Sequence, residues 1–193
     1  MVSSLRQVYQ LKVQLKGIRL PIWRRILIAD VAPLDVFHHA VQISMGWTNS
    51  HLHQFIDGKR RYGLVDPEYG MDWDDDLLDE SNFKVKDLFS EVGDSVLYEY
   101  DFGDGWLHQI KLEKITPFEA NQLLPVCIKG KRACPPEDVG GVPGYLDFLE
   151  KWQDESDPEH DDILEWAGEY FLGPEEFDQE EANEILREFF GSV

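Results

Sequence analysis

The sequence predicts an α+β protein in which a hairpin, a helix and further strands form an antiparallel or mixed sheet, followed by acidic helices at the C-terminus. Residues 7–16 alternate polar and apolar side chains, as a strand with one buried face does, and residues 22–29 fit a second strand. Residues 34–46 change to the helical repeat. Helix-start signals then recur in residues 156–193. This order of elements also fits a ubiquitin-like roll.

The first hairpin contains a basic residue on an apolar face. The second strand places Arg24 on the same side as three isoleucines, because alternate residues of a strand share a face. A buried guanidinium needs a partner. We therefore expect Arg24 to pair with Asp101 or Asp104, with anion binding as the alternative.

Turn residues and apolar periodicity place the middle elements. Pro33 can open the helix at its first position. Short strands fit residues 51–56 and 60–65 across an Asp-Gly turn. The acidic run at residues 66–80 is expected to be a loop.

The second half of the chain predicts one more hairpin and a helical tail. A short helix fits residues 84–90, and strands at 95–101 and 106–115 flank a glycine-containing turn. Residues 125–144 are rich in Pro and Gly and are expected to form an ordered loop. The predicted tail helices cover 143–153, a segment from Asp157-Pro158 onward, and 179–190 with Asp178 as its cap.

Charge divides the chain unevenly. The 193 residues contain 38 Asp and Glu against 18 Lys and Arg, a net charge of −20. Residues 1–65 nevertheless hold nine basic and three acidic residues, a balance of +6. This excludes nucleic-acid binding over the whole surface and leaves it only for a local basic face of residues 1–65. We expect a domain at 1–155, with residues 156–193 packed on it as an acidic helical extension.

Targeting signals and paired cysteines are absent from the sequence. No signal peptide precedes the first strand, and no apolar run is long enough to span a membrane. Cys127 and Cys134 do not form a disulfide framework. We therefore expect a cytoplasmic protein with reduced thiols and no membrane partner.

Three segments carry candidate site residues. His51 and His53 stand two apart on a predicted strand, so both imidazoles would face one side and could share a metal ion. The second segment is the hairpin YEYDFGDGWLH, and the third is the loop CIKGKRACPPEDVGG. These two segments supply the other candidates, which are Asp101, Asp104, Trp106, His108, Glu137 and Asp138.

Each segment also has a plain structural interpretation. The two histidines can be packing residues, and Asp and Gly are ordinary turn formers. Tyr and Trp of the hairpin can be core residues, and the Pro-Pro-Glu-Asp run can be a stiff loop. The four best metal candidates are His51, His53, Asp104 and His108, for a divalent ion.

Five runs in order resemble the plasmid pRiA4b ORF-3-like family. They are PIWRR at 21–25, GW at 46–47, HLHQF at 51–55, YEYDFGDGWLHQI at 98–110 and CIKGKRACPPEDVGG at 127–141. The resemblance implies an association with mobile elements, and some relatives are labelled transposon resolvases. None of the five runs contains the serine that a serine resolvase needs.

Two functions follow. The first is a non-catalytic binding or accessory module, because Trp, Pro, Gly and Tyr dominate the motifs. The second is a metal-assisted enzyme acting on a phosphodiester or on DNA, with the His51/His53, Asp101/Asp104/His108 and Glu137/Asp138 groups as ligands and general base. Motifs of nucleotide, nicotinamide, serine-hydrolase and EF-hand proteins are absent from the sequence.

Overall fold

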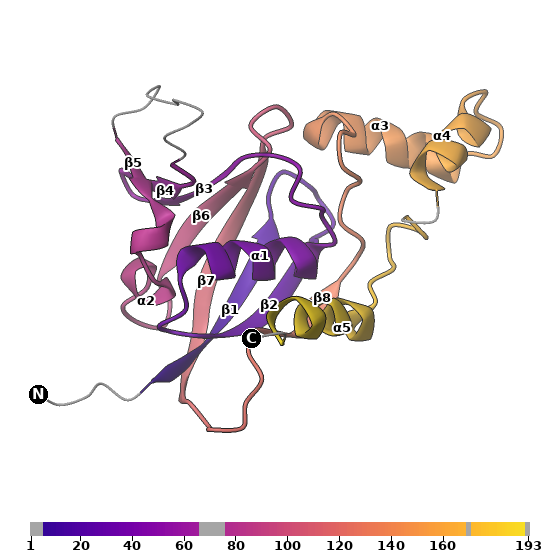
Figure 1. Ribbon diagram of the computed structural model, residues 1–193. Helices are drawn as coiled ribbons and strands as arrows, with labels where there is room; N and C mark the ends of the chain where they lie inside the picture. The colour runs from indigo at the N-terminus through magenta and orange to yellow at the C-terminus, as the bar shows by residue number, and fades with distance from the viewer. Residues whose placement is uncertain (1–5, 66–75, 169–170, 192–193) are drawn as a thin grey trace, which may run out of the picture.

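A single eight-stranded sheet forms the centre of the computed structural model, which describes residues 6–65, 76–168 and 171–191 (Figure 1). The strands are β1 (Gln7–Leu15), β2 (Trp23–Ala29), β3 (His53–Asp57), β4 (Arg60–Gly63), β5 (Leu77–Asp79), β6 (Ser95–Tyr100), β7 (Trp106–Pro117) and β8 (Val126–Lys131). The helices are α1 (Leu34–Met45), α2 (Val85–Leu88), α3 (Gly141–Gln153), α4 (His160–Ala167), α5 (Gln179–Phe190) and the 3-10 turn η1 (Glu80–Asn82).

The sheet is mixed, which confirms the predicted α+β class. Its strand order is β5-β4-β3-β6-β7-β1-β2-β8, and every neighbouring pair is antiparallel except β4 with β5. The three predicted hairpins are present, as β1 with β2, as β3 with β4 and as β6 with β7. Because β1 also pairs with β7, the first and the last of these hairpins join edge to edge in one sheet.

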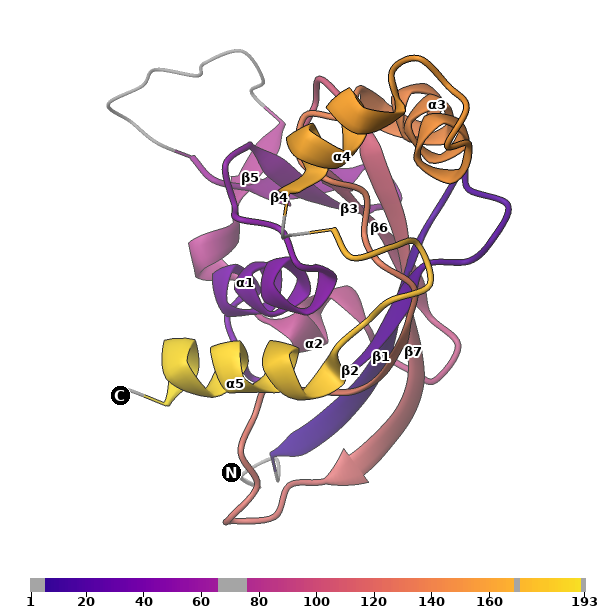
Figure 2. The same cartoon turned by 90° about the vertical axis from the view of Figure 1, so that its right-hand side faces the viewer.

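One face of the sheet carries the core. Leu11, Val13 and Leu15 of β1 are buried on this face, as the alternation of the strand predicts. Helices α1, α2 and α5 cover it, and no helix in the described part of the chain lies over the opposite face of β1, β2 and β7 (Figure 2). The sheet therefore has one buried side and one side open to solvent. None of the described helices has the length and apolar character needed to cross a membrane.

Several predicted boundaries differ from those of the structure. Of the acidic run 66–80, residues 66–75 lie outside the described residues, but residues 77–79 form β5 and residues 80–82 form η1 instead of a loop. In β5, the apolar residues Leu77 and Leu78 pair with residues of β4. The short strand follows from contact with β4, which the local composition does not reveal.

The loop predicted at 125–144 is also shorter than expected. Residues 126–131 form β8, which bonds through its backbone to β2, and α3 already begins at Gly141. Polar side chains are tolerated on such an edge strand because only its backbone is needed for pairing. In the tail, α4 begins at His160, since Asp157 caps a turn just before the helix by accepting from the Glu159 amide.

The last helix packs on the body of the protein. Asp178 caps α5 by accepting from the amides of Glu180 and Glu181, as predicted. Within α5, the side-chain amide of Asn183 bonds both backbone groups of Cys127 on β8, each at 2.8 Å. Helix α5 thus lies against the edge of the sheet and against α1 (Figure 2).

Candidate metal centre beside a histidine-lined hollow

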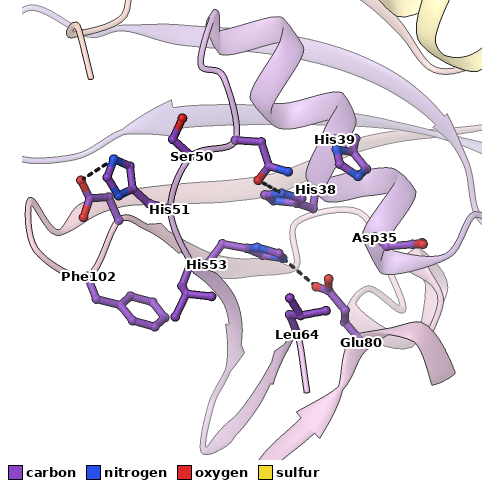
Figure 3. Close-up of a pocket in the computed structure, with 12 residues that line it drawn as sticks. Asp35, His38, His39, Ser50, His51, His53, Leu64, Glu80 and Phe102 are labelled. Carbon is purple, nitrogen blue, oxygen red and sulfur yellow. Dashed lines mark hydrogen bonds and ion pairs between the residues drawn. The ribbon is translucent and has the colours of Figure 1, made fainter. Parts of the chain in front are cut away.

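A hollow of about 740 Å³ opens at the edge where α1, the start of β3, η1 and the turn after β6 meet (Figure 3). Four of the six histidines of the chain line it, namely His38, His39, His51 and His53. Glu80 and Asp101 contribute carboxylates to the same wall. The fold therefore gathers imidazoles and carboxylates from four separate segments.

His53 and Glu80 form a buried pair in this wall. His53 Nε2 lies 2.7 Å from Glu80 Oε2, and both side chains are more than nine-tenths buried. The imidazole of His53 stacks on that of His38, with ring centroids 3.4 Å apart and planes at 8°. His53 Nε2 and Glu80 Oε2 are already bonded to each other. This pair therefore stabilises the wall of the hollow and offers little to a ligand.

His38 is fixed in a neutral state by its partners. Its Nε2 lies 2.7 Å from Asn49 Oδ1, and its Nδ1 lies 2.9 Å from the hydroxyl of Tyr98, which also accepts from Gln42. Burial, with a smaller contribution from nearby His53, lowers the pKa of His38 to about 3. A neutral imidazole that donates to Asn49 and accepts from Tyr98 satisfies every one of these groups.

His51 stands apart from this network. It lies before β3 and not within it, so the prediction that His51 and His53 face the same side of a strand is wrong. Figure 3 shows the two imidazoles pointing away from each other. His53 points to Glu80, and His51 points to the turn after β6.

The imidazole of His51 meets three carboxylates. Its Nε2 lies 3.2 Å from Asp138 Oδ1, 3.7 Å from Asp101 Oδ2 and 3.9 Å from Glu137 Oε2. This nitrogen is buried from solvent and has no hydrogen-bond partner. Ligand atoms of His51, Asp101 and Asp138 all lie within 4.8 Å of one another, which marks them as the candidate metal ligands among the described residues.

Tight turns hold the carboxylates in place. Asp101 has a positive φ of 55°, and its Oδ1 accepts from the amides of Gly103 and Asp104, so Oδ2 is left to face His51. Asp138 has a φ of 57°, again in the left-handed region that favours glycine. Both acidic residues thus adopt an uncommon backbone conformation at the point where they approach the imidazole.

Glu137 is anchored from the opposite side. Its Oε1 accepts from the backbone amide and hydroxyl of Thr48 and from the hydroxyl of Tyr100, at 2.9, 3.2 and 3.0 Å. Burial, followed by the charge of Glu137, raises the pKa of Tyr100. The tyrosine therefore stays protonated and keeps the carboxylate oriented.

Asp104, Trp106 and His108 do not join this cluster. Asp104 accepts from the amide of Gly140 and so ties the hairpin turn to the loop before α3. The side chains of Trp106 and His108 are fully buried in the core, because both point to the helix-covered side of β7. Burial lowers the pKa of His108 to about 4, so this histidine is a neutral core residue.

Arg24 is also remote from the predicted carboxylates. Its guanidinium donates to the backbone carbonyls of Ser44, Trp23 and Lys131, at 2.6, 3.0 and 3.1 Å. It also lies 3.7 Å from the ring centroid of Phe177. The expected ion pair with Asp101 or Asp104 is therefore wrong, because backbone carbonyl oxygens, including those of Ser44 on α1 and Lys131 on β8, accept its hydrogen bonds instead.

Sequence reasoning found four members of the cluster and missed their neighbours. His51, Asp101, Glu137 and Asp138 were candidates, and the structure brings all four together. Tyr100, which orients Glu137, was assigned only to the core. The missed residues of the hollow are His38, His39, Asn49 and Glu80. The adjacent histidines on a helix were the available signal, but they match no ligand spacing.

Comparison with known proteins assigns the chain to a family. A model of the family described as plasmid pRiA4b ORF-3-like protein matches residues 7–183. The chain belongs to this family. The match extends past residue 141, where the last of the five runs ends, and includes α3, α4 and the first part of α5.

Two relatives are themselves without an assigned activity. The chain is 37% identical over 169 residues to the uncharacterized protein y4hQ of Sinorhizobium fredii (strain NBRC 101917 / NGR234), covering 87% of this chain and 83% of that protein. It is similar to the crystal structure of MM3350, a protein of unknown function from Methanosarcina mazei Go1, with a TM-score of 0.80 and 38% identity. That match covers 92% of this chain and 98% of the other. The Methanosarcina mazei Go1 protein therefore has the same fold as this chain.

Proposed function

We propose that this protein is a non-catalytic binding module that holds one divalent cation at His51, Asp101 and Asp138 and presents it to a ligand in the hollow. The observation that carries the proposal is the buried Nε2 of His51, which has no hydrogen-bond partner and points at three carboxylates. A buried nitrogen without a partner is costly, and a cation shared with the carboxylates would remove that cost.

The spacing of the ligand atoms supports a small metal ion. Neighbouring ligands at about 2.1 Å from a metal ion lie about 3.0–3.4 Å apart. The separation of His51 Nε2 from Asp138 Oδ1 is 3.2 Å, and that from Asp101 Oδ2 is 3.7 Å. The first separation falls within this range and the second exceeds it by about 0.3 Å.

The ligand types favour Zn²⁺ or Mn²⁺. Imidazole suits zinc-like ions, and carboxylates suit Mg²⁺, Ca²⁺ and Mn²⁺, so one imidazole with two or three carboxylates favours ions that accept both. Three protein ligands leave coordination positions open, and these would face the hollow because His51 and Asp101 line it.

The non-catalytic part of the proposal rests on what surrounds the cluster. A metal-assisted enzyme needs a second group that moves protons beside the ion. Three of the seven residues expected as ligands and general base, His108, His53 and Asp104, are committed to the core, to Glu80 and to Gly140 respectively. The Tyr100 hydroxyl that contacts Glu137 has a raised pKa and holds its proton.

Calorimetric titration of the full chain with MnCl₂ and with ZnCl₂ tests the cation site. We expect one site per chain, weaker binding of Mg²⁺, and at least a tenfold loss of affinity in His51→Ala and in Asp101→Asn. Asparagine keeps the Oδ1 that accepts from Gly103 and replaces only the Oδ2 that faces His51, so the turn is retained. His160→Ala, on α4, is the matched control for the loss of one imidazole. Binding unaffected by both variants would remove the basis of the site.

Hydrolysis of bis(p-nitrophenyl) phosphate separates the module from the metal-assisted enzyme. With saturating Mn²⁺ we expect no turnover above that of the free ion. Turnover that disappears in Asp101→Asn would instead favour the enzyme. Inorganic phosphate titrated into the Mn²⁺-loaded chain should bind, and it should not bind the metal-free chain if the cation presents the ligand.

A further inference from the structure

The open face of the sheet carries a row of cations in register. Strand pairing places Lys129 of β8 opposite Arg25 of β2, Arg25 opposite Lys12 of β1, and Lys12 opposite Lys111 of β7. Paired residues project from the same face of a sheet, and neighbouring strands lie about 4.8 Å apart. Four basic side chains therefore cross four strands within about 14 Å.

Further residues extend this row into a surface, which we call the basic face. Lys131 lies beside Trp23 in the next register position, and Lys114 pairs with Gln10 on the other side of the row. The basic face consists of Lys12, Trp23, Arg25, Lys111, Lys114, Lys129 and Lys131. It gathers six cations in a chain whose net charge is −20.

Few carboxylates offset this charge. Glu113 is in contact with the row, where it binds Arg25 through both of its oxygens at 2.5 and 3.0 Å. Glu99 on β6 lies farther along the sheet and accepts from Gln54. Like charges directly opposite each other on paired strands are destabilising. Glu113 offsets only part of the repulsion among the four cations of the row, and a polyanion laid across the row would relieve the rest.

An aromatic ring lies among the cations. The ammonium of Lys12 is 5.4 Å from the ring centroid of Trp23, and the guanidinium carbon of Arg25 is 5.1 Å from it. Trp23, the first residue of β2, is only partly buried. Basic groups that follow a backbone, next to an aromatic ring on which a base can stack, are the combination found in proteins that bind single strands.

The face is accessible over the described residues. Figure 2 shows α1, α2 and α5 on the other side of β1, β2 and β7. Lys111, Lys114, Lys129 and Lys131 are exposed. The surface is also a sheet without a helix or ribbon that could enter a duplex groove, whereas unstacked bases can be splayed over a sheet.

We propose that the basic face binds single-stranded nucleic acid, with phosphates along the row Lys129–Arg25–Lys12–Lys111 and a base stacked on Trp23. The acidic remainder of the chain confines the contact to this face, because it repels phosphates elsewhere. Four of the six cations come from β7 and β8, so the face is not limited to the basic first third that the sequence indicated. The proposal does not depend on the cation site, because that site lies beside the hollow and not on the basic face.

Fluorescence anisotropy with labelled 12-nucleotide oligo-dT and oligo-U tests the proposal. The experiment uses the full chain in EDTA, with a salt series. Each phosphate contact on a single strand contributes about −0.7 to the slope of log K against log salt, so four contacts predict a slope of about −3. Lys12→Gln with Lys111→Gln should reduce the slope by about 1.4 and weaken binding, and Trp23→Ala should weaken binding about tenfold or more.

A matched control separates local contacts from net charge. Lys59→Gln with Lys86→Gln removes two charges from the β3–β4 turn and from α2, and we expect the affinity and slope to stay unchanged. Asp101→Asn should also leave binding intact, so the failure of one proposal does not imply the failure of the other. No binding at low salt, equal binding of duplex DNA, or an equal loss in the control variant would each overturn the proposal. Circular dichroism confirms that every variant is folded.

Discussion

Two buried histidines make the stability of this protein depend on pH in a calculable way. Burial lowers the pKa of His38 to about 3 and that of His108 to about 4, against 6.5 for an unperturbed imidazole. Both side chains are almost completely buried. Below pH 6.5 these two histidines therefore bind protons in the unfolded chain but stay neutral in the folded chain, so stability falls as the pH drops.

The size of the effect follows from linkage. One pKa unit corresponds to about 1.4 kcal/mol, so protonating the unfolded chain at pH 5 costs about 2 kcal/mol of stability for each histidine. Between pH 7.5 and pH 5 we expect a combined loss of about 4 kcal/mol. The loss continues until the pH passes the folded-state values and then levels off for these two groups.

Urea denaturation at a series of pH values measures this loss, with one variant to isolate a histidine. His108→Leu removes a titrating group from the core, so the pH-dependent loss between 7.5 and 5 should shrink by about 2 kcal/mol. Asn183→Ala is the control, because it weakens the protein and leaves both histidines in place, so its loss should match that of the wild type. An equal pH-dependent loss in His108→Leu and the wild type would refute the reasoning.

Two further predictions concern packing, and both are checked by urea denaturation at pH 7.5. Asn183→Ala leaves the backbone N–H and C=O of Cys127 without their partners, so we expect a loss of about 2–4 kcal/mol. Gly141→Ala should cost at least about 2 kcal/mol, because Gly141 has a φ of +67° and an added Cβ would lie 2.5 Å from the carbonyl oxygen of Asp104. Gly93→Ala is its control, since that glycine has a positive φ of 110° and open space around it. Equal losses in the two glycine variants would show that the contact with Asp104 is unimportant.

The sequence predicted the elements whose signals are local. The alternation in β1, the helix after Pro33 and the Asp178 cap each follow from neighbouring residues, and each is present. The two strands that the sequence missed, β5 and β8, lie at the two edges of the sheet. An edge strand is defined by the partner that it pairs with, and its own composition need not show alternation, so local patterns could not find it.

The candidate site was predicted in its parts but not in its grouping. Residue type identified His51, Asp101 and Asp138 as ligands, since imidazole and carboxylate bind divalent ions. Residue type could not show that His108 faces the core or that the imidazole of His53 is paired with the carboxylate of Glu80. These outcomes depend on where a strand begins and on contacts between segments far apart in the sequence. Arg24 is a similar case, because backbone carbonyls of α1 and β8 satisfy it.

The contact of Asn183 with Cys127 also protects the protein against self-association. Strand β8 is the last strand on its side of the sheet, and an exposed last strand is a template on which another chain can add its own strand. Asn183 occupies the outward N–H and C=O of Cys127, and α5 lies across that edge. A chain cleaved before α5 would expose a strand free to extend into a neighbouring molecule, so the C-terminal helix closes one end of the sheet to growth.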